Sequence, residues 1–313
     1  MGLINMSHRV FISSSSFAEY DQKPLKILQG HGLIVTANSI KKRLNRQQLI
    51  EQAKGADAVI AGLEIYDAQV LEHLKDLRCI SRCGVGVDNI DLTAAQAKGI
   101  KIFITPDAVV QPVVEFTLAL ILNLLRKVTR HNVYMNQRQW QRLMGSQLAG
   151  KTVGVIGLGR IGRKVAEALL SLGAQVVGYD IYPDKAWCQT RGVPLLGRDQ
   201  ILGLSDILSL HLAADAQNPF VLTKQDFQSM KKGALLINVA RGVFIDEMAL
   251  LEALQEGQLS GAGLDVYVQE PYTGPLCDLD NVILTPHIAT LTQESRLAME
   301  IEAAQNLVNF FNK

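Results

Sequence analysis

Several signals that would assign this sequence to a particular class of protein are missing. Its four cysteines, Cys79, Cys83, Cys188 and Cys277, form no CxxC pair and have no other spacing typical of metal ligands. Scattered cysteines in a chain of 313 residues are typical of reduced thiols in a cytosolic protein. We therefore expect no metal site and no disulfide framework.

An excess of charge of one sign is lacking too. The chain has 31 Lys and Arg against 30 Asp and Glu, which gives a net charge of +1. It has no basic stripe for nucleic acid and no acidic tail. We expect no nucleic-acid partner. A hydrophobic content of 48% is typical of a soluble globular enzyme.

Long apolar runs are also missing. The most apolar run, residues 116–125, lies between Glu115 and Arg126 and is too short to span a bilayer. The N-terminal residues lack the apolar core of a signal peptide. We expect a cytoplasmic protein with no membrane partner.

The clearest signal present is a glycine-rich turn. Residues 152–156 predict a short buried strand, Gly157-Leu-Gly-Arg-Ile-Gly162 a turn, and residues 164–172 a helix. A second strand, residues 175–178, leads to Asp180. This order of elements predicts the βαβ unit of a dinucleotide site.

Each glycine of the turn has a predicted task. Gly157 permits the tight turn, Gly159 lets the backbone approach a pyrophosphate, and Gly162 lets the helix pack close to the strand. The free N–H groups of the helix N-terminus favour phosphate. Asp180 is expected to accept hydrogen bonds from the adenosine ribose and to repel a 2′-phosphate, which favours NAD over NADP. The alternative for Asp180 is a strand-end cap.

Strands and helices alternate along the whole chain, which predicts parallel sheets. The predicted fold class is α/β, with two Rossmann-like domains and the active site in the cleft between them. Residues 1–104 plus 288–313 are expected to form a substrate-binding domain, and residues 105–287 an NAD-binding domain. The second domain is expected to begin with a long apolar helix over residues 115–130. The terminal helix, residues 293–311, needs an apolar surface, and the first domain is the available partner.

Polar residues follow three predicted strands of the second domain. Arg241 follows one, Asp265 and Glu270 follow another, and His287 follows a third. The carboxyl ends of parallel strands face the ligand crevice, so we expect these side chains to converge near a nicotinamide.

Together these side chains suit hydride transfer to a 2-oxo acid. Arginine binds a carboxylate in a bidentate fork. Histidine exchanges the proton that accompanies the hydride, and a neighbouring carboxylate stabilises the imidazolium. The alternatives left open are a loop anchor for Arg241, a solvated turn residue for Glu270, a core histidine for His287 and a helix cap for Asp265.

The chain resembles the D-isomer-specific 2-hydroxyacid dehydrogenases, and within that family the D-3-phosphoglycerate dehydrogenase branch. Five segments in family order carry the resemblance: Ser81-Arg-Cys-Gly-Val-Gly-Val-Asp-Asn-Ile-Asp91, Gly157-Leu-Gly-Arg-Ile-Gly162, Asn238-Val-Ala-Arg-Gly242, Gly263-Leu-Asp-Val-Tyr-Val-Gln-Glu-Pro271 and Thr285-Pro-His-Ile-Ala-Thr290. The family's catalytic arginine, glutamate and histidine fall on Arg241, Glu270 and His287.

The resemblance also implies an NAD site and a homodimer. The implied cofactor-binding residues are Gly157, Gly159, Arg160, Ile161, Gly162, Asp180, His211, Val239, Ala240 and Asp265, the last as the contact of the nicotinamide carboxamide. Dimerisation is expected to use the NAD-binding domain, including its long first helix.

A loop of the first domain resembles the family's substrate loop. It contains Arg82, Cys83, Gly84 and Val85, and the family's backbone N–H groups hold the substrate carboxylate there. Arg82 occupies the position of an arginine that contacts the substrate phosphate in phosphoglycerate dehydrogenases. The alternative for Arg82 is a surface charge. The segment Trp140-Gln-Arg142 resembles one that can reach a neighbouring subunit's site, although a surface charge explains Arg142 as well.

Three positions depart from the family pattern. Val109 stands where an asparagine is common near the substrate pocket, and Pro112 where a small residue is common. Ala213 replaces a usual proline. The first two changes leave the natural substrate open. The sequence ends after its last predicted helix, so a C-terminal regulatory domain is not expected.

The predicted function is that of an NAD-dependent D-2-hydroxyacid dehydrogenase, with D-3-phosphoglycerate as the first candidate substrate. The alternative within the family is a glyoxylate or hydroxypyruvate reductase. The alternative from another class is an NAD-sensing regulatory protein, because transcriptional corepressors resemble this fold. A plain binding module would have no need of Arg241, Glu270 and His287 together.

Overall fold

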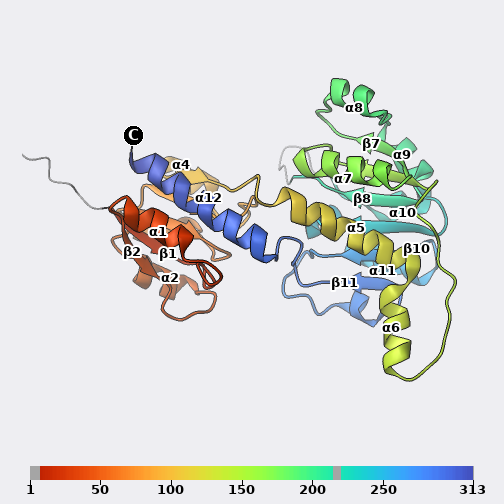
Figure 1. Ribbon diagram of the computed structural model, residues 1–313, viewed down its shortest axis with the longest axis horizontal. Coiled ribbons are helices and arrows are strands. Elements are labelled where there is room, and N and C mark those ends of the chain that lie inside the picture. Colours follow the sequence, from red (N-terminus) through yellow and green to blue (C-terminus); the bar gives the residue numbers. More distant parts are fainter. Residues whose placement is uncertain (1–7, 214–219, 313) are drawn as a thin grey trace, which may run out of the picture. The chain divides into compact units, whose positions relative to one another are not determined.

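The computed structural model describes residues 8–213 and 220–312. The chain divides into two compact units (Figure 1). Unit 1 comprises Met1–Val109 and Leu291–Lys313, and unit 2 comprises Val110–Thr290. Each unit has its own parallel sheet.

The sheet of unit 1 has the strand order β2-β1-β3-β4-β5. Its strands are β1 (Arg9–Ile12), β2 (Ile34–Ala37), β3 (Ala58–Ala61), β4 (Cys79–Arg82) and β5 (Lys101–Phe103). Strand β3 is a short apolar run, and the burial of all its residues and of the first three residues of β4 shows that both faces are covered. The order reverses between β1 and β3, where doubly wound sheets of this kind bind ligands.

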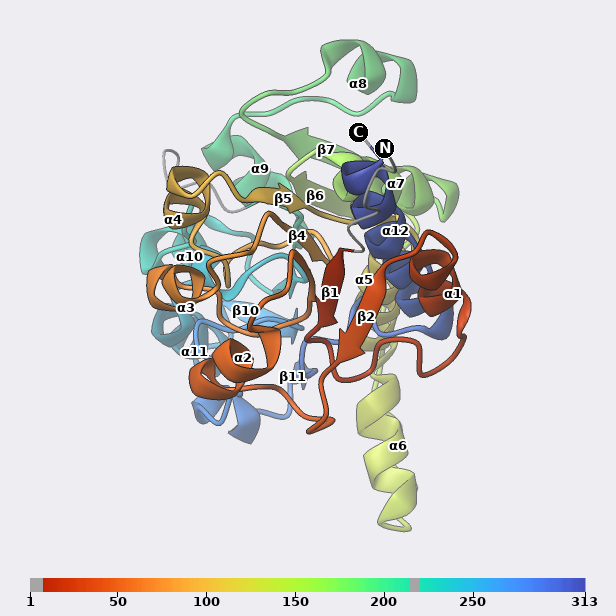
Figure 2. The ribbon, with the colours of Figure 1, turned by 90° about the vertical axis from the view of Figure 1, so that its left-hand side faces the viewer.

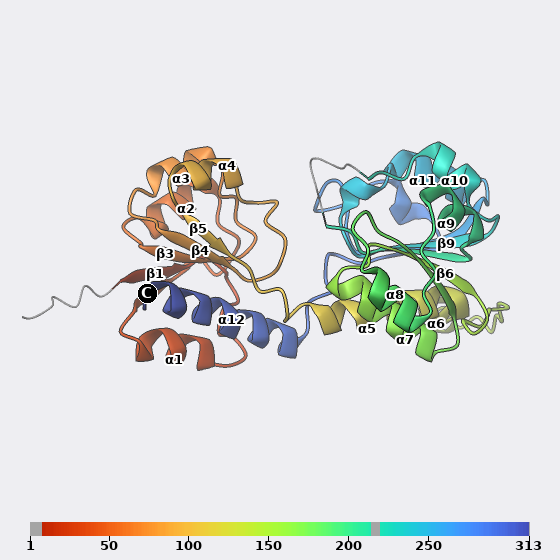
Figure 3. The same ribbon diagram turned by 90° about the horizontal axis from the view of Figure 1, so that it is seen from above.

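Helices cover both faces of this sheet (Figure 3). Helices α1 (Lys23–Gly30) and α12 (Gln293–Phe311) lie on one face, and α2 (Arg46–Ala53), α3 (Ala68–His73) and α4 (Leu92–Ala97) on the other (Figures 2 and 3). The terminal helix α12 packs against α1, β3 and β4. It does so through small and apolar side chains, namely Met299, Ala303, Ala304, Leu307 and Val308.

The sheet of unit 2 has the strand order β11-β10-β9-β8-β6-β7, and every pair in it is parallel. Its strands are β6 (Thr152–Ile156), β7 (Gln175–Tyr179), β8 (Ile207–Leu210), β9 (Ala234–Asn238), β10 (Leu259–Leu264) and β11 (Val282–Leu284). The order reverses between β6 and β8. The turn after β6 therefore lies at the position where a doubly wound sheet binds a dinucleotide.

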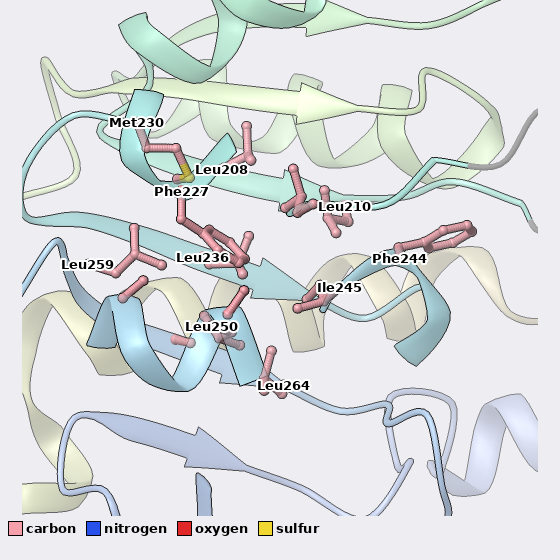
Figure 4. Close-up of a cluster of buried hydrophobic side chains, with 14 of the residues drawn as sticks. Leu208, Leu210, Phe227, Met230, Leu236, Phe244, Ile245, Leu250, Leu259 and Leu264 are labelled. Carbon is pink, nitrogen blue, oxygen red and sulfur yellow. The ribbon is translucent and has the colours of Figure 1, made fainter. Parts of the chain in front are cut away.

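Two apolar clusters fill unit 2, one on each face of its sheet. One joins the sheet to α9 (Arg198–Leu204), α10 (Lys224–Ser229) and α11 (Glu247–Gln255), as Figure 4 shows for Phe227, Leu236 and Leu250. The other joins it to α5 (Val110–Arg126), α7 (Arg160–Ser171) and α8 (Lys185–Arg191). Two short 3-10 turns, η1 (Gly242–Phe244) and η2 (Pro275–Asp278), complete the unit.

The long first helix of unit 2 differs from the prediction of one helix over residues 115–130. Helix α5 ends at Arg126, Lys127 adopts a left-handed conformation with φ of 54°, and α6 (Val128–Asn136) begins after it. Helix α6 buries none of its residues and projects from the rest of unit 2 (Figures 1 and 2). No helix in the described part of the chain has the length and apolar character to cross a membrane.

Candidate active site

The sequence-predicted catalytic residues follow three neighbouring strands of unit 2. Strand β10 pairs with β9 on one side and β11 on the other. Arg241 lies just beyond the end of β9, Glu270 beyond β10 and His287 beyond β11. All three residues therefore lie at the carboxyl edge of one half of the sheet.

Glu270 and His287 form an ion pair across two of these loops. Nδ1 of His287 lies 2.9 Å and 3.2 Å from the two carboxylate oxygens of Glu270. Their side chains are 37% and 44% exposed, so the pair is open to a ligand. With Nδ1 donating to the carboxylate, Nε2 is the ring nitrogen available to a substrate.

A second carboxylate, that of Asp265, holds the loop that carries His287. Its oxygens accept hydrogen bonds from Thr285 Oγ1 at 2.7 Å, Ile288 N at 2.8 Å and Ala289 N at 2.8 Å. Burial raises the pKa of Asp265, and these hydrogen bonds oppose that shift. Between the anchored residues, His287 adopts a left-handed φ of 55°, which a residue other than glycine keeps only when its neighbours hold it.

The loop that carries Arg241 is held just as closely. The buried side chain of Asn238 accepts a hydrogen bond from Ala240 N at 3.0 Å and donates one to Arg241 O at 2.8 Å. A Cβ on Gly242 would lie 1.9 Å from the backbone carbon of Tyr267. The Arg241 loop thus lies directly against the segment that leads to Glu270.

The glycine-rich turn has the geometry that a pyrophosphate requires. Gly157 has a φ of 94°, and a Cβ on Gly162 would lie 1.8 Å from the carbonyl oxygen of Gly157. A Cβ on Gly159 would meet nothing within 4 Å. Gly159 is the N-cap of α7 and places no side chain on the helix N-terminus, which is therefore open to an anion.

Asp180 follows β7 and faces this turn. Its carboxylate accepts hydrogen bonds from Leu158 N at 2.6 Å and from Tyr182 N at 2.8 Å. Arg163 adds a second link, because it donates to Leu158 O at 2.7 Å and to Asp184 at 3.0 Å. These contacts fix the Asp180 carboxylate beside the glycine-rich turn, where the sequence predicts the adenosine ribose. These residues and the turn fit NAD.

His211 follows β8 on the other side of the turn. Its Nε2 lies 2.8 Å from Ser209 Oγ, and its Nδ1 is buried with no hydrogen-bond partner in the described part of the chain. A Cβ on Gly157 would lie 2.6 Å from the carbonyl oxygen of His211. Burial lowers the pKa of the His211 imidazole from 6.5 to about 3, so the ring stays neutral at the cofactor site.

This buried ring makes the stability of unit 2 depend on pH. Below about pH 6.5 the unfolded chain protonates His211 and the folded chain does not, so the free energy of unfolding falls as pH falls, by up to ~1.4 kcal/mol per pH unit. We expect His211→Asn to reduce that loss between pH 7.5 and 5. Both tryptophans, Trp140 and Trp187, lie in unit 2, so urea unfolding followed by their fluorescence measures this unit. If the free energy of unfolding changed with pH equally in the wild type and in His211→Asn, His211 would not be the source of the pH dependence.

The predicted substrate loop belongs to unit 1. Arg82 ends β4, and its guanidinium donates to the carbonyl of Cys83. Cys83 is buried, and burial raises the pKa of its thiol to about 12. Two N–H groups of the loop already have acceptors, since Cys83 N donates to Ala61 O at 3.0 Å and Gly84 N to Thr105 Oγ1 at 2.7 Å. Anion binding here would use the next N–H groups, beginning with that of the exposed Val85.

The remaining predicted cofactor residues lie at the start of α7 and in the segment after β9. Arg160 and Ile161 are the first residues of α7, and Val239 and Ala240 are buried between β9 and Arg241.

Among the described residues, no group of three or more His, Cys, Asp or Glu side chains could hold a metal ion. Arg163 and Tyr267 were not predicted as site residues: Arg163 is an ordinary helical position, and Tyr267 lies within the segment 263–271 with no role assigned to it.

Comparison with known proteins decides the family. Residues 118–289 match the model of the D-isomer specific 2-hydroxyacid dehydrogenase, NAD binding domain. The chain belongs to this family. Its cofactor is NAD, in agreement with the prediction from Asp180 and the glycine-rich turn.

Relatives within the family carry different names. A D-3-phosphoglycerate dehydrogenase of Archaeoglobus fulgidus is 36% identical over 92% of this chain and 55% of that protein. The chain thus spans about half the length of that relative. A glyoxylate reductase of Thermofilum pendens is 37% identical over 84% of this chain and 81% of its own. A structure of D-lactate dehydrogenase from Aquifex aeolicus, complexed with NAD and lactic acid, has a TM-score of 0.83 at 28% identity and covers 97% of this chain and 96% of its own.

Proposed function

We propose that the chain is an NAD-dependent oxidoreductase that acts on the C2 hydroxyl of a small D-2-hydroxy acid. The observation that carries this proposal is the Glu270–His287 ion pair at 2.9 Å. Its members follow β10 and β11, next to β9 of Arg241, on the sheet that also holds the glycine-rich turn. A dinucleotide site alone needs neither the pair nor the arginine.

In the proposed mechanism, His287 and Arg241 act on the substrate, and Glu270 acts on His287. NAD, when bound, accepts the hydride from C2. Nε2 of His287 takes the proton of the C2 hydroxyl during oxidation and returns it during reduction. Glu270 orients the imidazole and stabilises its charged form. Arg241 binds the substrate carboxylate and stabilises negative charge on the C2 oxygen.

We propose D-3-phosphoglycerate as the substrate to test first, which would make the reaction the first step of serine biosynthesis. The supporting features are Arg82 in the substrate loop and the relatives named D-3-phosphoglycerate dehydrogenase. The second candidate is glyoxylate or hydroxypyruvate. It is supported by the glyoxylate reductase relative, which the chain covers to 81% of its length, and by the substitutions Val109 and Pro112.

The organisation around the site is part of the proposal. Unit 1 is proposed to bind the substrate, and the enzyme is proposed to act in the cytoplasm. A homodimer is proposed to form through α5 and α6, since α6 buries no residue and Trp140 and Met144 beyond it are 80% and 88% exposed. Arg142 lies between these two residues.

A panel of 2-hydroxy and 2-oxo acids, assayed at the NADH absorbance with NAD and NADP, tests the proposal. We expect turnover of a D-2-hydroxy acid with NAD preferred, and Arg82→Ala to lower kcat/KM for 3-phosphoglycerate while leaving hydroxypyruvate nearly unchanged. An equal effect on both acids would contradict the phosphate role of Arg82. A preference for NADP would contradict the role of Asp180, and no turnover of any member would contradict the dehydrogenase.

A further inference from the structure

The side chain of Tyr267 joins the ends of β10 and β11. It is 8% exposed and stacks on Tyr272 with the ring centroids 4.5 Å apart. Its hydroxyl lies 3.1 Å from Leu264 O and 3.0 Å from Thr285 O, and it accepts a hydrogen bond from Thr285 N at 3.1 Å. A phenol has one donor and two acceptor positions, and this hydroxyl has partners for both functions.

Tyr267 contacts both Glu270 and the loop that carries His287. The backbone N–H of Tyr267 donates to Glu270 Oε1 at 3.2 Å. Its hydroxyl contacts the carbonyl oxygen of Thr285, which also accepts the backbone N–H of His287 at 3.0 Å. One residue therefore holds the carboxylate through its backbone and the histidine loop through its side chain.

The Asp265 carboxylate does not duplicate this link. Its hydrogen bonds go to Thr285 Oγ1, Ile288 N and Ala289 N, all in the loop of His287. Asp265 thus fixes the conformation of that loop, whereas Tyr267 connects the loop to the segment that carries Glu270.

We propose that Tyr267 is a positioning residue whose hydroxyl sets the geometry of the Glu270–His287 pair, and so the ring nitrogen that His287 presents to the substrate. The inference rests on the proposed roles of those two residues. Burial raises the pKa of the phenol, which keeps the hydroxyl protonated and able to donate.

Tyr267→Phe removes this hydroxyl with little expected effect on folding. In the variant, Thr285 N still donates to Leu264 O at 3.0 Å, and Thr285 O still accepts from His287 N. Each backbone group therefore keeps a partner. We expect kcat to fall about tenfold, which is the effect of losing one positioning hydrogen bond. The KM for NAD and the melting temperature are expected to stay close to those of the wild type.

Tyr272→Phe is the matched control. It removes a hydroxyl from the stacked partner, whose oxygen accepts a hydrogen bond from Leu276 N rather than from the loop of His287. We expect wild-type kcat and KM from this variant. Equal kcat values for Tyr267→Phe and Tyr272→Phe would overturn the inference.

A spectroscopic readout separates this inference from the catalytic proposal. The ¹⁵N shifts of a histidine ring report which nitrogen carries the proton. The His287 signals are identified by their loss in His287→Asn, among the six histidines of the chain. We expect the proton on Nδ1 in the neutral wild type, and a shift toward Nε2 in both Tyr267→Phe and Glu270→Gln. A shift in Glu270→Gln but not in Tyr267→Phe overturns the inference alone. Wild-type turnover by His287→Asn would instead overturn the proposed function.

Discussion

Replacing Arg241 with alanine is expected to lower kcat/KM for the best 2-oxo acid by a factor on the order of 10³. The guanidinium is proposed to make two charge-assisted hydrogen bonds to the substrate carboxylate, each contributing roughly 1.5–3 kcal/mol. Steady-state kinetics with saturating NADH measures the effect. The affinity for NADH, from a fluorescence titration, is expected to change by less than about twofold.

Two further variants show whether the loss belongs to the guanidinium. Arg241→Lys keeps the charge but lacks the planar fork, so we expect intermediate activity. Arg191→Ala removes another arginine of unit 2, which is 53% exposed and pairs with Glu167 on α7, and is expected to leave kcat/KM unchanged. Wild-type kcat/KM in Arg241→Ala would remove this residue from the proposed mechanism.

Replacing His287 is expected to lower kcat by about 10²- to 10⁴-fold, the usual contribution of general acid–base catalysis. The left-handed backbone at this position guides the choice of variant. Asparagine tolerates a φ of 55° better than alanine does, so His287→Asn removes the imidazole with less added strain than His287→Ala. Binding of NADH is expected to stay nearly intact in both variants.

The pH dependence supplies the control for this prediction. Wild-type kcat is expected to depend on pH because a side-chain general base takes the proton, and His287→Asn is expected to lack that dependence. Glu270→Gln is expected to lie between the two, because the histidine remains but loses its carboxylate. A His287→Asn enzyme with wild-type kcat, or with an unchanged pH profile, would show that another group transfers the proton.

Helices and strands could be predicted from the sequence where the spacing of apolar residues and the glycine or polar residues at the ends indicate the same element. Strand β6 and its glycine turn, and the terminal helix α12, lie where the pattern predicted them. The break at Lys127 was not predicted, because no glycine or proline marks the point where the backbone turns left-handed. Helices α4, α8 and α9 have six or seven residues each, too few for a periodic signal.

The candidate site was predictable in its members and less so in its contacts. Arg241, Glu270 and His287 follow strands, and the parallel sheet brings strand ends together. Nδ1 of His287 contacts Glu270, which lies 17 positions away in the sequence. We attribute this contact to the anchoring by Asp265 and Tyr267, which could not be predicted from residue type. The substrate loop was predicted to hold a carboxylate through its backbone N–H groups, but those of Cys83 and Gly84 already have acceptors within unit 1.

The most direct test of the account is a crystal structure of the chain with NAD and a 2-oxo acid bound. The account predicts the substrate carboxylate on the guanidinium of Arg241 and the C2 oxygen about 2.6–3.2 Å from Nε2 of His287, with C2 facing the nicotinamide ring. A ternary complex in which the C2 oxygen bonds to other groups, while His287 and Glu270 lie away from the nicotinamide, would contradict it.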